Sequence, residues 1–188
     1  IGGHDPLFAP QSKEDSDLFN RFVLNGYEII QSWDALVYHF TSRGSRFNKH
    51  SGGSAGNNSQ EWLHTTNKNM RNFIRKWGNT VQHDPLMKPI ITPKYSVKIR
   101  VRNCTPRLLE ILEPWCDLIS VDLSQEVIDS YVSKEESNTI INLRGKINTD
   151  KESEIELKVN GKEMNQQDFH ILQQLPQIIQ QSGTVGEF

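Results

Sequence analysis

The sequence has little cysteine, no long apolar run and no excess of one charge. Cys104 and Cys116 match no metal-binding or redox motif, so we expect two free thiols, a reducing compartment and a cytoplasmic protein. No apolar run reaches the roughly 18 residues that a membrane span needs. The net charge of −2 gives no long-range attraction for nucleic acid or an anionic membrane. We therefore expect neither partner, and any anion must be bound locally.

The chain does contain enough patterned sequence for an α+β (α/β-like) protein. Its 188 residues are 35% hydrophobic and 23% charged, which suffices for one large domain or two small ones. Residues 81–93 are proline-rich without periodicity and are the best candidate for a linker. We predict a first region over 1–80 and a small α+β domain over 94–188. Because the chain begins at Ile1, inside what looks like a motif, we expect it to be the C-terminal part of a longer protein.

Two helices are predicted in the first region. Residues 13–25 follow Ser12, a good N-cap, and carry acidic residues in the first turn. Their apolar residues have helical spacing and predict one buried face, made of Leu18, Phe19, Phe22 and Val23. Residues 60–77 have the same kind of spacing, and Gly78 ends that helix.

Two short strands and a loop are predicted between these helices. Residues 27–30 and 35–40 are rich in β-branched and aromatic side chains, which favours strands. Residues 41–59 are rich in Gly, Ser and Asn and show no hydrophobic period. A loop of this length is commonly functional or disordered. We interpret it as a mobile basic lid.

The second domain is predicted to have the order βαβαββα(β). Thr105 and Ser124 are expected to cap helices, and Pro176 is expected to kink the last one. Asn160-Gly161 is a strong turn signal. The strands are expected at 95–101, 118–121, 139–147, 154–159 and 184–188, and the helices at 106–113, after 124 and at 166–181.

Glu14, Asp15 and Asp17 are candidate catalytic residues at the start of the first helix. Acidic side chains are common there because the helix dipole favours negative charge, at roughly 0.3–1 kcal/mol each. The alternative is a general base or a metal-linked carboxylate. Asp15-Ser16-Asp17 also spells D-x-D, but within a helix two residues at i and i+2 point apart, which argues against joint metal binding.

His39 ends the second predicted strand. It is either a partly buried structural histidine or a ligand for a metal or phosphate at the carboxyl end of a sheet. The basic loop that follows, with Arg43 and Arg46, favours the second interpretation, since arginines on a loop suit a diphosphate that is clamped and released.

Taken together, the stretch GGHDPLFAPQSKEDSDLFNRFVLNGYEIIQSWDALVYHF resembles the C-terminal catalytic portion of family 2, GT-A-fold glycosyltransferases. That family has a GG-[FH]-D-x-x-[FY] turn, an E-D-x-D-L helix start followed by Arg, then G-Y-x-[IV] and a strand that ends near His. The same pieces occur here in the same order over about forty of the 188 residues. Departures are His4 where Phe is usual, and a nucleotide-binding half with its own D-x-D that these residues do not include.

The resemblance implies a role for each candidate residue. Asp15 would be the general base of an inverting transfer, with Glu14 and Asp17 orienting the site or contacting the acceptor. Residues of the first turn would shape the acceptor pocket, and basic residues of the loop would neutralise the nucleotide diphosphate. These two groups are Gly2, Gly3 and Asp5 for the acceptor, and Arg43 and Arg46 for the diphosphate.

The resemblance also implies ligands. His39 would contact a divalent metal, Mn²⁺ or Mg²⁺, or the diphosphate. The donor would be a nucleotide-sugar and the acceptor a glycan or another hydroxyl compound. Two alternatives stay open: a non-catalytic binding or oligomerisation module that keeps a transferase-like remnant, and a metal-dependent phosphoesterase or nuclease. Whether the protein is a transferase or a binding module, the domain of residues 94–188 is a candidate for the contact between subunits of a homo-oligomer.

Overall fold

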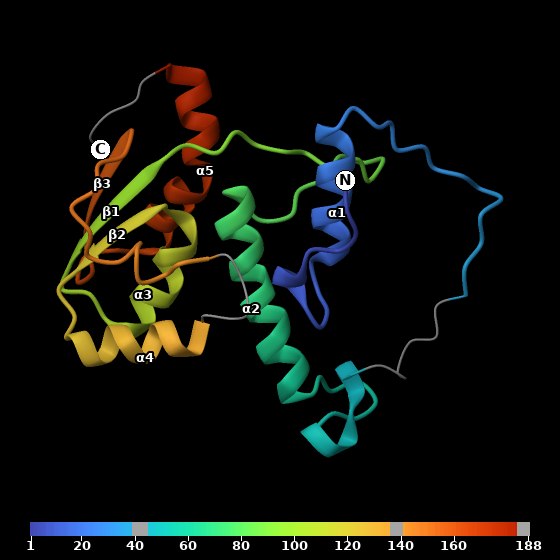
Figure 1. Cartoon of the computed structure of the whole chain (residues 1–188), viewed down its shortest axis with the longest axis horizontal. Coiled ribbons are helices and arrows are strands. Elements are labelled where there is room, and N and C mark those ends of the chain that lie inside the picture. Colours follow the sequence, from blue (N-terminus) through green and yellow to red (C-terminus); the bar gives the residue numbers. More distant parts are fainter. Residues whose placement is uncertain (39–44, 136–140, 184–188) are drawn as a thin grey trace. The chain divides into compact units, whose positions relative to one another are not determined.

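The structure is a computed structural model of the 188-residue chain and describes residues 1–38, 45–135 and 141–183 (Figure 1). Helices and a small parallel sheet make it an α+β protein, as predicted. Contacts divide the chain into two compact units. Unit 1 comprises residues 1–71 and 81–90, and unit 2 comprises residues 72–80 and 91–188. Among the described residues, no helix combines the length and apolarity needed to cross a membrane.

Unit 1 is built on two helices, α1 (Glu14–Leu24) and the first part of α2 (Gln60–Trp77). Both confirm the predicted helices to within one residue. A single turn of 3₁₀ helix, η1 (Pro6–Phe8), precedes α1 and buries Leu7 and Phe8. Asn69 of α2 is buried and donates from Nδ2 to the carbonyl oxygens of Phe8 (2.8 Å) and Gln11 (2.6 Å). This amide therefore holds the N-terminal segment on α2.

The predicted buried face of α1 is wrong in part. The N-cap is Lys13, in a left-handed conformation (φ 75°) and without a side-chain cap, rather than Ser12. The residues that α1 buries are Asp17 and Asn20, whereas Phe19 and Val23 are exposed. Helical spacing identifies residues that share a face, but it does not say which face meets the rest of the unit.

The strands predicted at 27–30 and 35–40 are absent over the described residues 27–38, which have no regular secondary structure. Tyr27 packs edge-on against Phe22, with ring centroids 5.6 Å apart, and its N–H donates to the Phe22 carbonyl. Beyond it, large apolar side chains are exposed, Trp33 at 84% and Val37 at 90%. Strand-forming composition gives a strand only where a neighbouring strand accepts its hydrogen bonds, and no described strand lies beside this segment.

Residues 45–59 form hydrogen-bonded turns in place of an irregular loop. They contain η2 (Ser45–Phe47) and η3 (Lys49–Ser51). Ser59 is fully buried, donates from Oγ to the Ser45 carbonyl (2.8 Å) and accepts from the Trp62 N–H (3.2 Å), so it caps α2. Gly53 lies so close to the backbone of Asn48 that a Cβ would come within 2.8 Å of it. These contacts tie the basic segment to the start of α2.

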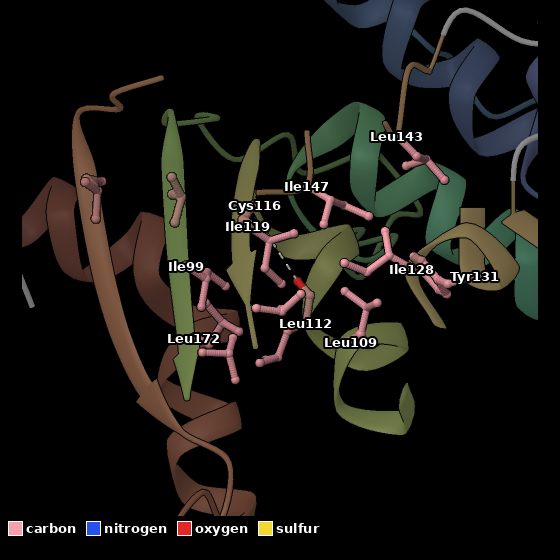
Figure 2. Packing of buried hydrophobic residues seen from close by; sticks show 14 of the residues in the cluster. Ile99, Leu109, Leu112, Cys116, Ile119, Ile128, Tyr131, Leu143, Ile147 and Leu172 are labelled. Carbon is pink, nitrogen blue, oxygen red and sulfur yellow. Dashed lines mark hydrogen bonds between the residues drawn. The ribbon is translucent and has the colours of Figure 1, made fainter. Parts of the chain in front are cut away.

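Unit 2 holds a three-stranded parallel sheet of order β2-β1-β3. The elements run β1 (Val97–Arg102), α3 (Pro106–Leu112), η4 (Glu113–Trp115), β2 (Leu118–Val121), α4 (Gln125–Glu135), β3 (Ile155–Asn160) and α5 (Gln166–Ser182). Ile99 pairs with Ile119 of β2 on one side and with Leu157 of β3 on the other. Figure 2 shows Ile99 and Ile119 pointing into the same apolar cluster as Leu109 and Leu112 of α3.

The order of unit 2 is βαβαβα over the described residues, one strand short of the prediction. Residues 141–147 form a turn, in which the N–H of Lys146 donates to the Leu143 carbonyl, and a single parallel bridge joins Ile147 to Ile119. Leu143 and Ile147 are buried, so the apolar pattern is real, but it belongs to a packed turn. The start of this predicted strand, residues 139–140, and the predicted strand 184–188 lie outside the described residues.

A buried charged network lies in unit 2. Arg75, in the last turn of α2, donates to Glu113 Oε2 (2.9 Å from Nε) and to Glu135 Oε2 (3.0 Å). Tyr131 donates to the same Glu113 oxygen at 2.7 Å, and Lys146 Nζ lies 2.6 Å from Glu113 Oε1. The side chains of Glu113 and Glu135 are fully buried. Burial alone would lower the pKa of the Arg75 guanidinium, but Glu113 raises it, so the cation persists inside the unit.

Candidate functional site

A cavity of about 640 Å³ lies within unit 1, beside α1. One wall is the α1 face that carries Asp15, Ser16, Phe19 and Asn20. The other walls come from residues 28–31 and from residues 81–89. Most of the surface that the cavity presents is apolar, and its volume lies in the range of small-molecule sites.

Asp15 is the predicted catalytic residue that the structure places on this cavity. It is exposed, in the first turn of α1, where the positive end of the helix dipole favours a carboxylate. None of the other predicted site residues among the described ones lines the cavity. Asp15 therefore lines the cavity, whereas its acidic neighbours Glu14 and Asp17 do not.

Asp17 is fully buried and is held by Arg21, whose Nε lies 2.9 Å from Asp17 Oδ2. The same guanidinium donates to the carbonyl oxygens of Ile1 (2.6 Å) and Gly3 (2.7 Å). Asp17 and Arg21 therefore fasten the N-terminal turn to α1. This is a structural use for a residue that the sequence placed in the catalytic group.

The residues of the N-terminal turn also have local roles. Gly2 adopts a positive φ of 76°, which glycine accommodates without strain. The Asp5 carboxylate accepts from the Leu7 N–H at 2.9 Å and caps η1. Gly2, Gly3 and Asp5 form the turn that Arg21 holds, and they do not line the cavity.

Glu14 lies half-buried beside the N-cap Lys13. Its Oε2 is buried and accepts no hydrogen bond from the described residues. Burial lowers the pKa of the Lys13 ammonium, and the Glu14 carboxylate partly offsets this. The structure therefore places Glu14 next to a cation of its own chain and away from the cavity lining.

Arg46 is the basic-loop residue that the structure describes. Its guanidinium carbon lies 4.8 Å from the ring centroid of Trp62 and 5.2 Å from that of Phe47, and its Nε donates to Asn58 Oδ1 at 2.7 Å. Stacking and one hydrogen bond fix the plane of the guanidinium, while none of the described residues accepts from its terminal amino groups. His39 and Arg43, the predicted metal and diphosphate residues, lie outside the described residues.

The acidic residues of α1 do not form a metal site among themselves, because Asp17 is turned to Arg21 and Asp15 to the cavity. Over residues 1–38, 45–135 and 141–183, no three histidine, cysteine, aspartate or glutamate side chains gather in a way that could hold a metal ion. The divalent cation implied by the resemblance therefore has no ligand set among the described carboxylates.

Sequence reasoning missed two parts of the cavity. Asn20 is 7% exposed, lines the cavity and makes no side-chain hydrogen bond to the described residues. Residues 82–90, interpreted as linker, form a tight turn in which the N–H of Ile90 donates to Gln82 and that of Met87 to Asp84. A single asparagine inside an amphipathic helix gives no signal, but the sequence Asp84-Pro85 is a turn signal that favours local structure.

At the carboxyl edge of the sheet in unit 2, where α/β folds commonly bind ligands, the turns that follow β1 and β2 and the end of β3 are hydrogen-bonded to one another. Asp122 accepts from the backbone N–H groups of Asn103 (2.6 Å) and Cys104 (2.7 Å). Asn103 Nδ2 donates to Asn160 Oδ1 at 2.9 Å. A Cβ on Gly161 would lie 2.4 Å from the Asn103 carbonyl oxygen. These contacts pack the turns after β1 and β3 against each other, while a second cavity of about 450 Å³ lies beside Ile99 of β1, residues 157–160 of β3 and α5.

Comparisons of this chain with models of protein families, with curated proteins and with solved structures returned no match. The case for a function therefore rests on the residues and on the geometry of unit 1.

Proposed function

We propose that this chain carries the acceptor side of an inverting glycosyltransferase that moves a sugar from a nucleotide-sugar donor to a hydroxyl acceptor. The observation that carries the proposal is that Asp15 and Asp17, two positions apart on α1, have different environments. Asp15 is exposed on the wall of a cavity large enough for a small acceptor, while Asp17 is buried against Arg21. The ordered motifs of residues 2–39, which resemble family 2 glycosyltransferases, support the same role for Asp15.

In the proposed reaction, Asp15 accepts the proton of the acceptor hydroxyl. The freed oxygen forms a bond to the anomeric carbon, and the bond from that carbon to the diphosphate oxygen breaks with inversion. The leaving group is a nucleoside diphosphate, which carries away the electron pair. A carboxylate at a helix start is a weak base, so the proton transfer has to occur late, as the new bond forms.

The donor side of the proposal rests on Arg46, with Arg43 and His39 as further candidates. A guanidinium with a fixed plane, and with terminal amino groups that donate to none of the described residues, suits bidentate binding of a phosphate. A divalent cation, when bound, would neutralise charge on the diphosphate, and the described carboxylates do not form a ligand set for it.

The test uses the natural gene product that contains these 188 residues, at its full length. It is incubated with UDP- and GDP-sugars and Mn²⁺ or Mg²⁺, with and without hydroxyl acceptors, and nucleoside diphosphate release is followed. We expect acceptor-dependent release that falls by about 10²–10⁴ in Asp15→Asn, the usual contribution of a general base. Absence of release, or equal rates for Asp15→Asn and wild type, would overturn the proposal.

A second candidate is a non-catalytic binding or assembly module. The large exposed apolar side chains of residues 30–38 support it, since an interface with a partner would remove them from water. They are Ile30, Trp33, Leu36, Val37 and Tyr38. Light scattering distinguishes the two: a stable oligomer that is dispersed by Trp33→Ser and Leu36→Ser, together with no nucleotide-sugar turnover, favours the module.

A further inference from the structure

We propose that the acceptor of this cavity is an amphiphilic alcohol, a hydroxyl group carried on an apolar aryl or alkyl body, and not a free sugar. The inference rests on the proposed function, which supplies the role of Asp15 and the need for a hydroxyl. It deepens that function by naming the chemistry of the acceptor. Three observations on the described residues carry it.

The first observation is the apolar lining. Phe19, Ile30, Leu86 and Met87 line the cavity and are 45%, 78%, 65% and 64% exposed. Large apolar side chains that converge on one hollow while still facing water favour a partner that covers them. A free sugar presents hydroxyl groups on most of its surface, and these would lose their hydrogen bonds to water when placed against apolar side chains. An aryl or alkyl body would match the same walls.

The second observation is that Leu86 and Met87 lie on a turn whose backbone is fixed by hydrogen bonds. Asp84 Oδ1 accepts from the N–H groups of both Leu86 and Lys88, each at 2.8 Å. Between them Met87 adopts a positive φ of 62°, a strained conformation for a residue with a side chain. The carboxylate of Asp84 thereby presents Leu86 and Met87 to the cavity before any ligand arrives. Preorganised walls of this kind reduce the ordering cost of binding.

The third observation is Asn20. The residue is 7% exposed, lines the cavity and makes no side-chain hydrogen bond to the described residues. The amide of Asn20 is therefore available to a ligand or to water in the cavity. Asn20 follows Asp15 by five positions on α1, about 7–8 Å along the helix. The cavity therefore offers a base, Asp15, and a further amide, Asn20, among other polar side chains that include His83 and Lys88. This arrangement suits an acceptor with its hydroxyl at one end and a polar group further along an apolar body.

The experiment measures binding and transfer separately, on the natural full-length protein. Binding of 4-propylphenol, of 4-(2-hydroxyethyl)phenol and of methyl glucoside is followed by ligand-detected NMR. We expect both phenols to bind and methyl glucoside not to bind. Leu86→Ser and Met87→Ser should each weaken both phenols by at least tenfold, and because both side chains are more than half exposed, the fold should persist. Leu24→Ser, an exposed apolar residue of α1 outside the cavity lining, is the matched control and should bind as wild type.

Asn20→Leu tests the third observation. It should weaken the phenol with the second hydroxyl and leave 4-propylphenol unchanged or tighter. Transfer of sugar to a phenol, lost in Asp15→Asn, would support both the inference and the proposed function. Transfer to methyl glucoside but not to either phenol would overturn the inference and leave the transferase standing. Phenol binding that depends on Leu86 and Met87, without any transfer, would overturn the transferase and with it the acceptor role.

Discussion

The Nε of Arg21 lies 2.9 Å from Oδ2 of Asp17, one helical turn earlier on α1. This contact removes Asp17 from the group of acids that the sequence offers for catalysis, because its carboxylate is buried and paired. It also joins the N-terminal turn to α1 through the carbonyls of Ile1 and Gly3. Asp15, two positions earlier, keeps its carboxylate on the cavity.

Arg21→Ala is therefore expected to loosen the N-terminal part of unit 1. The substitution leaves the buried Asp17 carboxylate without its guanidinium, a change that costs about 2–4 kcal/mol in comparable pairs. The measurement is native-state hydrogen exchange of the α1 amides, which reports their opening free energy. Arg21→Lys should lower the opening free energy by an intermediate amount, because lysine keeps the positive charge but lacks the planar guanidinium that donates to several acceptors at once. Exchange as slow as in wild type would show that the contact has no structural role.

The carboxyl of Glu113 makes unit 2 sensitive to acid. Burial alone would raise its pKa, but Lys146 and Arg75 hold it well below the ordinary 4.5. A pKa lowered by folding gives stability that is present above about 4.5 and is lost as the pH falls toward the folded-state value. We expect the opening free energy of unit 2 to be flat from pH 7 to 5 and to fall below pH 4.5.

Glu113→Gln should remove most of this acid dependence and lower the opening free energy at pH 7 by roughly 3–5 kcal/mol, because Arg75 and Lys146 lose their buried partner. Glu156→Gln is the control. Glu156 pairs with Arg100 on the surface, at 2.6 Å, and exposed pairs of this kind contribute little to stability because solvent screens them. An acid slope that is the same in Glu113→Gln and wild type would contradict the assignment.

The two thiols should differ in reactivity. Both are free, as predicted. Burial, with Asp122 second, raises the pKa of Cys104 to about 11, and burial raises the pKa of Cys116 to about 12. At pH 8 we expect slow alkylation of the half-exposed Cys104 by iodoacetamide and alkylation of the buried Cys116 only as unit 2 opens. Peptide mass spectrometry measures both rates, with the urea-unfolded protein as reference. Equal rates in the folded protein would be inconsistent with these environments.

Gly161→Ala tests the backbone packing at the carboxyl edge of the sheet. The new Cβ would lie 2.4 Å from the carbonyl oxygen of Asn103, which is backbone and has little freedom to move. We expect a loss of about 1–3 kcal/mol in the opening free energy of β3 amides, the usual cost of overpacking. Gly3→Ala is the matched control, because its Cβ would meet nothing within 4 Å. Equal effects of the two substitutions would mean that this edge is looser than described.

Helices with strong caps and long apolar patterns could be predicted from the sequence. Thr105 caps α3 and accepts from the Leu108 N–H at 3.1 Å, and α2 ends at Gly78 as expected. Element ends of this kind depend on neighbours in sequence. The strands predicted at 27–30 and 35–40 are absent over the described residues 27–38 for the opposite reason, since a strand depends on a partner strand that the local sequence does not identify.

The candidate site was predictable only in part. Asp15 was singled out because it stands at a helix start within a recognisable motif. Asn20 and the Leu86–Met87 turn were missed, because a cavity is made by residues that are distant in sequence. The burial of Arg75 was not predicted either, since its partners Glu113 and Glu135 lie far along the chain. Hydrophobic periodicity does not predict ion pairs between residues that are distant in sequence.

The most direct test compares Asp15→Asn with Asp17→Asn in the natural full-length protein, with transfer rates expressed per folded molecule. We predict that Asp15→Asn loses about 10²–10⁴ in kcat with an unchanged opening free energy of α1. Asp17→Asn should lower that free energy while its rate per folded molecule stays within a few fold of wild type. A stable, inactive Asp17→Asn beside an active Asp15→Asn would contradict the assignment of Asp15 as the base.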